Sequence, residues 1–224
     1  MQIHILTLFP AMFKGPFSES IIKRAIEKEI VKIEVHNLRD YSADKHKKCD
    51  DRPFGGGPGM VLKPEPIFKA VEIIAQEKVK KKHKTILTSP QGRVFTQRIA
   101  KELSRLEEII FICGHYEGVD ERVKEIIDDE ISIGSYVLSG GELPTMVITD
   151  ALIRLIPGVL GCVQSSQQES FVKGDLLDHP QYTRPAVFRR MKVPEVIISG
   201  DHQAIEDWRK RKAEEKTAYR NNQL

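Results

Sequence analysis

Five short runs with the character of β-strands recur between residues 2 and 135, and they constrain the fold more than any other feature. They lie at 2–8, 32–37, 84–89, 109–114 and 130–135. The segments between most of them carry apolar residues at helical spacing. Strands that alternate with helices are typical of an α/β domain, so the pattern predicts a mainly parallel sheet.

Helix signals fill most of the intervals between these runs. Thr96 is a residue that readily caps a helix, and Ile99, Ala100 and Leu103 after it form an inward-facing stripe. Pro157-Gly158 is a stop signal for the most apolar of these segments. We expect helices near 18–30, near 65–77, after Thr96, from Asp120, and over 143–156.

The character of the chain changes after Gly161. Residues 1–161 form the predicted α/β domain, and residues 162–172 are polar, small and without periodicity, which is typical of a flexible linker. The remaining stretch, 173–224, has few strand-like runs and one clear helix signal, which starts at Asp201 and carries Ile205 and Trp208. It predicts a small helical second domain.

Charge and cysteine content narrow the class of protein. The chain has 224 residues and a net charge of +3, and three basic clusters modestly favour a nucleic-acid partner. The three cysteines show no paired spacing, and no His/Asp cluster has metal-ligand spacing, so we predict neither a disulfide framework nor a metal site. No signal peptide or membrane-length apolar run is seen, so a cytoplasmic protein without membrane contact is expected. The basic clusters are 78–84, 189–192 and 209–212.

Three loops of small residues follow three successive predicted strands. They are TSPQG at 88–92, GHYEG at 114–118 and ISIGSYVLSGGELP at 131–144. In a parallel sheet, ligands bind at the carboxyl ends of the strands. Any one loop is explained equally well by turn geometry, but the three together favour a ligand site. The phosphate-binding glycine signatures are absent and the last loop lacks lysine and arginine, so an adenosine-like ligand without phosphate fits better.

Longer motifs carry a family resemblance. LTSPQG, CGHYEGVDER, SIGSYVLSGGELP, RLIPGVLG and LLDHPQYTRP occur in this order, with LFPAMF and DDRPFGGGPGM before them. From the N-terminus to about Trp208 the chain closely resembles the bacterial TrmD-type tRNA (guanine-N1)-methyltransferases. The resemblance implies a SPOUT fold, which is a parallel α/β sheet with helices on both faces and a deep trefoil knot. It also implies a small helical C-terminal domain and a homodimer with the active site at its interface.

The resemblance implies the ligand as well, S-adenosyl-L-methionine. Its cationic sulfonium would suit a site without lysine or arginine. Carried over motif by motif, the cofactor-binding residues would be Leu87, Ser89, Pro90, Gln91, Gly114, Tyr116, Glu117, Gly118, Ser132, Ile133, Gly134, Tyr136, Leu138, Gly140, Gly141 and Pro144.

The reaction implied by the resemblance moves a methyl group to N1 of the guanine on the 3′ side of the anticodon, position 37 of tRNA. Arg154 matches the family's arginine, and its apolar neighbours make a functional or paired cation more probable than an idle one. Glu169 stands where the family has an aspartate and is assigned as the base. Glutamate keeps the carboxylate and a similar intrinsic pKa, but it is longer by one methylene. Ser135 replaces a second family aspartate.

For tRNA, the resemblance points to Asp50, Gly55, Gly59, Ser165, His179, Tyr182 and Arg184. The stretch HPQYTRP could instead be a rigid turn between prolines. Magnesium is left open by the resemblance. Three other interpretations also stay open: a SPOUT enzyme for another RNA position such as a ribose hydroxyl, a non-catalytic RNA-binding module, and a nucleotide-binding oxidoreductase.

Overall fold

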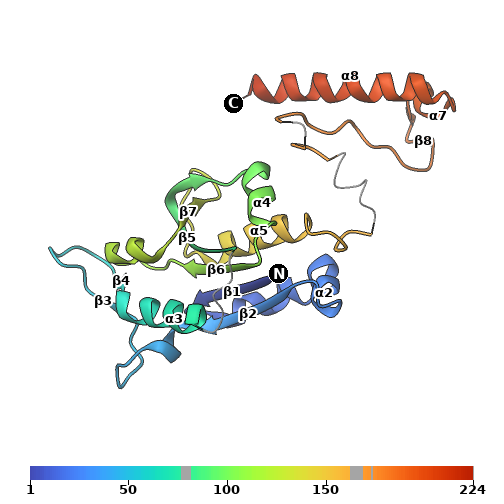
Figure 1. Ribbon diagram of the computed structural model, residues 1–224. Helices are drawn as coiled ribbons and strands as arrows, with labels where there is room; N and C mark the ends of the chain where they lie inside the picture. The colour runs from blue at the N-terminus through green and yellow to red at the C-terminus, as the bar shows by residue number, and fades with distance from the viewer. Residues whose placement is uncertain (77–81, 162–168, 173, 224) are drawn as a thin grey trace. The chain divides into compact units, whose positions relative to one another are not determined.

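The computed structural model describes residues 1–76, 82–161, 169–172 and 174–223 (Figure 1). Contacts within the chain divide it into two compact units, Met1–Gly161 and Cys162–Leu224, and each is described by itself. Most of the predicted linker, residues 162–168, lies outside the described residues, as does Ser165. No described helix is long and apolar enough to cross a membrane.

The first unit is built on a parallel sheet of five strands, which confirms the predicted α/β class. The strand order is β2-β1-β6-β5-β7, so the chain starts next to one edge of the sheet and later fills the other side. Every pairing in this sheet is parallel. The strands are β1 (Gln2–Thr7), β2 (Lys32–Asn37), β5 (His83–Val94), β6 (Glu108–Cys113) and β7 (Asp129–Ser132).

Helices cover both faces of the sheet, as the resemblance implied. One face packs against α1 (Lys14–Phe17), α2 (Ser20–Glu27), α4 (Gln97–Leu103) and α5 (Glu142–Ile153). The opposite face packs against η2 (Leu38–Tyr41), α3 (Pro64–Gln76) and η3 (Glu121–Ile126). The short elements η1 (Pro10–Phe13), β3 (Asp50–Asp51) and β4 (Val61–Leu62) complete the unit.

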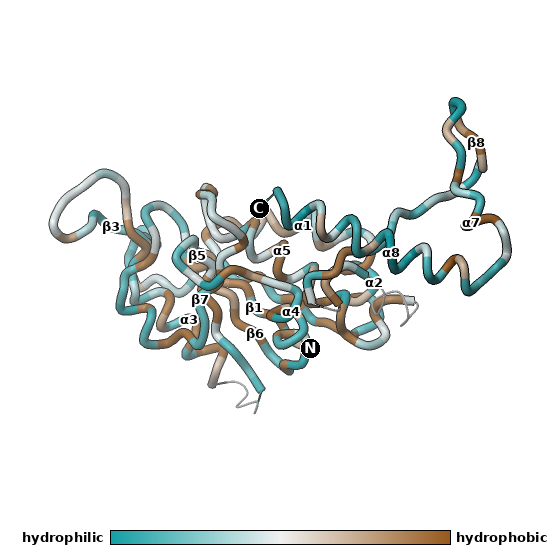
Figure 2. Tube along the Cα trace, turned by 90° about the horizontal axis from the view of Figure 1, so that it is seen from above, coloured by the Kyte–Doolittle hydropathy of each residue, from teal (hydrophilic) through white to brown (hydrophobic). Residues whose placement is uncertain are grey.

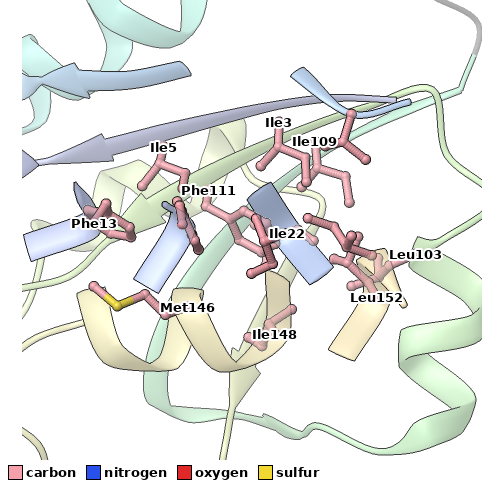
Figure 3. Packing of buried hydrophobic residues seen from close by; sticks show 14 of the residues in the cluster. Ile3, Ile5, Phe13, Ile22, Leu103, Ile109, Phe111, Met146, Ile148 and Leu152 are labelled. Carbon is pink, nitrogen blue, oxygen red and sulfur yellow. The ribbon is translucent and has the colours of Figure 1, made fainter. Parts of the chain in front are cut away.

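The alternation along the central strands explains this layering. Ile3 and Ile5 of β1 point with Phe111 of β6 toward Met146 and Leu152 of α5 (Figure 3). The residues between them face α3 instead, so both central strands are buried along their whole length. The hydropathy trace agrees, because the central strands are brown while α8 of the second unit is mostly teal (Figure 2).

The structure changes several predicted boundaries. The segment after Asp120 is a 3-10 helix, which is typical of short connectors, although Asp120 caps it as expected. The helix predicted near 18–30 is α2, and it ends at Glu27 because Glu29 takes a left-handed conformation with φ of 56°. TSPQG is not a loop after a strand but a bulge inside β5, which pairs again with β7 at Arg93 and Val94.

The helix α5 also ends earlier than expected. Its last residue is Ile153, and the next amides, of Leu155 and Ile156, bond three residues back to Leu152 and Ile153. Since Pro157 disfavours the α conformation at the residue before it, the chain tightens before the proline instead of continuing as α-helix. The N-cap at Thr96 and the buried stripe after it are confirmed.

Gly141 marks the place where the chain is threaded through the unit. Its amide donates to the carbonyl of Gly114 at 2.7 Å, and its carbonyl accepts from the Thr88 hydroxyl at 3.2 Å. The segment after β7 therefore enters α5 between the carboxyl ends of β5 and β6. This is the local crossing that a knot at this edge of the sheet requires.

The second unit contains the helix predicted from Asp201, now seen as α8 (His202–Asn221), whose cap is the Asp201 carboxylate. Trp208 is buried within this unit, with the Tyr182 ring 6.2 Å away, centroid to centroid. The sequence did not predict the hairpin of β8 (Val187–Phe188) and β9 (Met191–Lys192), because two-residue strands carry no periodicity. A short helix, α7 (Glu195–Ile198), precedes α8.

Candidate active site

A cavity of about 280 Å³ lies at the carboxyl ends of β5, β6 and β7. Three segments line it: the bulge of β5, the turn after β6, and the loop between β7 and α5. All sixteen residues that the resemblance nominated for the cofactor are among its lining residues, from Leu87 to Pro144. The structure thus brings together residues that are spread over three separate motifs. The exposed Ser135 is not among them.

The first wall is the bulge in β5. Ile131 of β7 pairs both with Thr88 and with Arg93, so the residues between them leave the sheet and turn into the cavity. Ser89 closes this excursion by accepting the Gln91 amide at 3.1 Å. A side chain on Gly92 would meet the backbone of Glu130 at 2.4 Å, so this bulge requires glycine at that point.

The second wall is the turn after β6. The Gly118 amide donates to the His115 carbonyl at 3.0 Å, with Tyr116 and Gly118 at φ of 60° and 125°. This turn contacts the glycine-rich loop DDRPFGGGPGM (50–60), because the Glu117 amide donates to the Met60 carbonyl at 3.0 Å. The loop nominated for tRNA therefore adjoins the wall of the cavity.

The third wall is the loop from Ser132 to Gly141. The Ser132 hydroxyl donates to the Gly134 carbonyl at 3.0 Å and accepts the Gly134 amide at 3.2 Å. Tyr136 folds back, and its hydroxyl donates to the Ile133 carbonyl at 3.2 Å. These bonds connect the loop to itself on the cavity side.

The charges around the cavity correct one expectation. The site does contain a cation, Lys124, which lies on η3 and could not be seen from the last loop alone. Its Nζ lies 2.9 Å from Glu121 and 3.7 Å from Glu130, and Glu117 adds a third carboxylate. These three carboxylates outnumber the single ammonium group of Lys124, which is itself paired with two of them. The cavity therefore favours a cation over a phosphate.

Sequence reasoning missed a buried polar cluster beside the cavity. His115 lines it, and its Nδ1 lies 3.7 Å from a carboxylate oxygen of Glu142. The other Glu142 oxygen accepts a bond from the Thr7 hydroxyl at 2.7 Å. The ring of Phe9 packs on His115 with centroids 4.8 Å apart. The motif GHYEG contains His115 and is evident in the sequence. The other members of the cluster, Thr7 and Glu142, come from β1 and α5, which only the strand order brings close to this motif.

The two candidate catalytic residues do not line the cavity. Arg154 is the C-cap of α5, whereas the cavity is at the opposite, N-terminal end of this helix. With 12 residues in α5, the separation along the axis is about 18 Å at 1.5 Å per residue. Glu169 belongs to the second unit, where its carbonyl accepts the Val172 amide at 3.4 Å.

The residues nominated for tRNA fall on both units. Asp50 pairs with Leu62 in the small β3-β4 ladder, and Gly55 and Gly59 both adopt left-handed φ in the loop between these strands. Phe54 at the tip of that loop is fully exposed. His179, Tyr182 and Arg184 lie in the second unit, where His179 Nδ1 is 2.7 Å from Asp178.

A parallel sheet with helices on both faces, and a cavity whose wall is threaded between two strand ends, defines an α/β domain of the SPOUT type. Similarity to known proteins then narrows this class. The family model of the tRNA (guanine-1)-methyltransferase TrmD matches residues 1–224, so the chain belongs to this family. Its enzyme class, methyl transfer to a guanine of tRNA, follows from that membership.

Individual relatives agree with the family. A tRNA (guanine-N(1)-)-methyltransferase of Dictyoglomus turgidum is 56% identical over 217 residues, which covers 97% of this chain and 86% of the relative. One of Dehalococcoides mccartyi is 55% identical over 221 residues, covering 98% and 88%. The crystal structure of tRNA (m1G37) methyltransferase from Aquifex aeolicus is similar with a TM-score of 0.82 at 39% identity, covering 99% of this chain and 93% of that one.

Proposed function

We propose that this chain transfers the methyl group of S-adenosyl-L-methionine to N1 of the guanine at position 37 of tRNA, next to the anticodon. The observation that carries the proposal is the convergence of all sixteen nominated cofactor residues on one cavity at the carboxyl ends of β5, β6 and β7. Under this proposal the protein acts in the cytoplasm, with tRNA as its partner.

The backbone lining and the charge of the cavity suit this methyl donor. The cavity volume of about 280 Å³ is near the lower end for small-molecule sites. Backbone groups at Gly114, Gly118 and Gly140 line it without intervening side chains, which suits an adenine edge. The excess of carboxylates suits a sulfonium and an ammonium group. When bound, the donor supplies an electrophilic methyl group.

The chemistry at the acceptor sets the tasks of the chain's own residues. Guanine N1 must lose a proton as the methyl group arrives, while negative charge grows toward O6. The Glu169 carboxylate takes the N1 proton, and the Arg154 guanidinium donates hydrogen bonds to O6.

A second copy of the chain would supply what one copy lacks. Since Arg154 stands about 18 Å along α5 from its own cavity, it would act at the cavity of a partner. Three apolar side chains on this part of the chain are exposed. Val137, in the loop before α5, is mostly exposed, and Leu143 and Val147 on α5 are each close to half exposed. A homodimer through this face would bury them, and it would place the active site at the interface.

The second unit would hold the tRNA. Tyr182 and Arg184 suit a base that is splayed out of its stack, and the basic stretch 209–212 on α8 suits phosphates. The loop with Asp50, Gly55 and Gly59 adjoins the cavity through Glu117, which supports a role beside the reacting base. Ser165 is assigned to the same contact surface, although it lies outside the described residues.

The test uses labelled S-adenosyl-methionine and two tRNA transcripts that differ only at position 37, guanine against adenine. We expect label on the guanine transcript alone, recovered as N1-methylguanosine. Label on a ribose would instead indicate another SPOUT activity, and tRNA binding without label would indicate a non-catalytic module. Either result would overturn the proposal. Repeating the assay with EDTA tests the requirement for magnesium.

A further inference from the structure

Two histidines and a carboxylate meet on β1 and β2, away from the active site. His4 pairs with Glu34 across these parallel strands, and His36 follows two residues after Glu34 on the same face. That face is the one covered by η2 and α3. None of the three lines the cavity. Linear spacing gave no sign of this group, because only the strand register brings residue 4 beside residues 34 and 36.

The three side chains direct their donor atoms at one point. His4 Nδ1 lies 2.9 Å from His36 Nε2 and 3.3 Å from Glu34 Oε2. All three donor atoms lie within 4.8 Å of one another. Ligands bound to one zinc ion at about 2.0–2.1 Å in tetrahedral geometry would be separated by similar distances, so small side-chain adjustments would suffice.

In both imidazole rings, the nitrogen that would not bind the metal contacts an oxygen atom. The other nitrogen of His4, Nε2, lies 3.3 Å from the buried Glu108 carboxylate. The other nitrogen of His36, Nδ1, lies 2.9 Å from the Tyr41 hydroxyl. Metal-binding histidines commonly use their second nitrogen in this way, since the oxygen fixes the tautomer and the ring orientation.

The carboxylate is likewise divided between two tasks. Glu34 Oε1 pairs with the Lys32 ammonium. Oε2 is thereby left to face His4, with the Gln2 amide donating to it at 3.3 Å.

We propose that His4, Glu34 and His36 form a binding site for one divalent transition-metal ion, with Zn²⁺ as the best match. Two imidazoles and one carboxylate are a ligand set that zinc accepts readily, whereas Mg²⁺ and Ca²⁺ prefer oxygen ligands alone. The Glu34 side chain is one third exposed, so water can reach the fourth position. The ion would tie the edge strand β2 to β1, and its role would be structural because the group lies apart from the cavity.

The test is zinc binding to the untagged, metal-free protein, followed by titration calorimetry and by metal analysis after dialysis. We expect one Zn²⁺ per chain and a rise in the melting temperature with zinc but not with Mg²⁺. His36→Gln should weaken zinc binding at least 100-fold, and Tyr41→Phe should weaken it 10- to 100-fold. His46→Gln is the matched control, because His46 is exposed and lies outside β1 and β2. Co²⁺ should give the visible absorption of a tetrahedral site in the wild type.

Two results would overturn the proposal. One is the absence of zinc from the wild-type protein, which would leave a hydrogen-bonded histidine pair. The other is zinc that binds equally well to the His36→Gln variant, which would place it elsewhere. Circular dichroism and S-adenosyl-methionine binding show whether each variant is folded, and Tyr41→Phe, which removes only a hydroxyl, keeps the test decisive if His36→Gln unfolds.

Discussion

Replacing Gly141 by alanine tests whether the threading of the chain holds the cavity in shape. A Cβ atom at this position would lie 2.2 Å from the Thr88 hydroxyl oxygen, 2.8 Å from the Gly114 nitrogen and 2.9 Å from Cys113 Cα. Two of these neighbours are backbone atoms, one at the end of β6 and one in the turn after it, so the clash cannot be relieved by turning one side chain. The backbone at Gly141 has φ of −79°, which alanine adopts freely, so the effect is purely steric.

The expected loss follows from two contributions. Overpacking in a close-packed interior costs about 1–3 kcal/mol, and weakening the bond from the Gly141 amide to Gly114 costs about 1 kcal/mol more. The sum of roughly 2–4 kcal/mol corresponds to a melting temperature lower by about 4–16 °C for a chain of this size. Because the same atoms form the cavity wall, we also expect affinity for S-adenosyl-methionine to fall about tenfold or more, equivalent to about 1.4 kcal/mol.

Thermal unfolding by circular dichroism and titration calorimetry measure these two quantities. Gly15→Ala is the matched control, since a Cβ atom there meets nothing within 4 Å. It should be neutral or slightly stabilising, because alanine is the better helix former. If Gly141→Ala melts with the control and binds the donor as tightly as wild type, the proposed close crossing between β5 and β6 is wrong.

Four further changes test other parts of the molecule. Glu169→Gln should reduce methyl transfer about 10²–10⁴-fold while S-adenosyl-methionine binding, measured by calorimetry, stays nearly unchanged; full activity would reject Glu169 as the base. Arg154→Ala should lower kcat about 10²–10³-fold in the same assay, and unaltered turnover would contradict its role at O6. Glu142→Ala should destabilise the fold in urea by about 1–3 kcal/mol because it leaves the buried Thr7 hydroxyl without its acceptor, and Glu142→Gln should cost less. Cys113 should resist iodoacetamide at pH 8 in the native protein and react after denaturation, since complete burial raises the pKa of its thiol. Peptide mass spectrometry shows whether Cys113 is alkylated in each state, and alkylation in the native protein would refute this prediction.

Much of the fold was predictable because buried parallel strands and amphipathic helices leave strong periodic signals. The runs that became β1 and β6 are rich in isoleucine and buried along their whole length, since helices cover both of their faces. The errors lie where a local event ends the pattern. A left-handed residue at Glu29 and a proline at Pro157 each shortened a helix, and the return of Arg93 to the sheet made a bulge from an expected loop.

The candidate site was predictable as three loops but not as a set of partners. Small residues after successive strands predict a site at one sheet edge, and motif similarity supplies the ligand. The sequence did not predict three further groups of the site, Lys124, His115 and the buried carboxylate of Glu142. Their positions depend on strand order and on the crossing at Gly141. The histidine pair on β1 and β2 escaped for the same reason, because register is a property of the folded sheet.

The distribution of functional groups suggests how binding and chemistry are separated. The described residues that line the cavity all lie within residues 1–161, and hydrogen bonds inside its three walls shape it. Neither Arg154 nor Glu169, the two proposed catalytic residues, lines it. In the proposed mechanism these groups come together only when a second chain and the tRNA are present. The reactive methyl group would then meet a base and an oxyanion partner only with the correct substrate in place, which limits methylation of the wrong nucleophile.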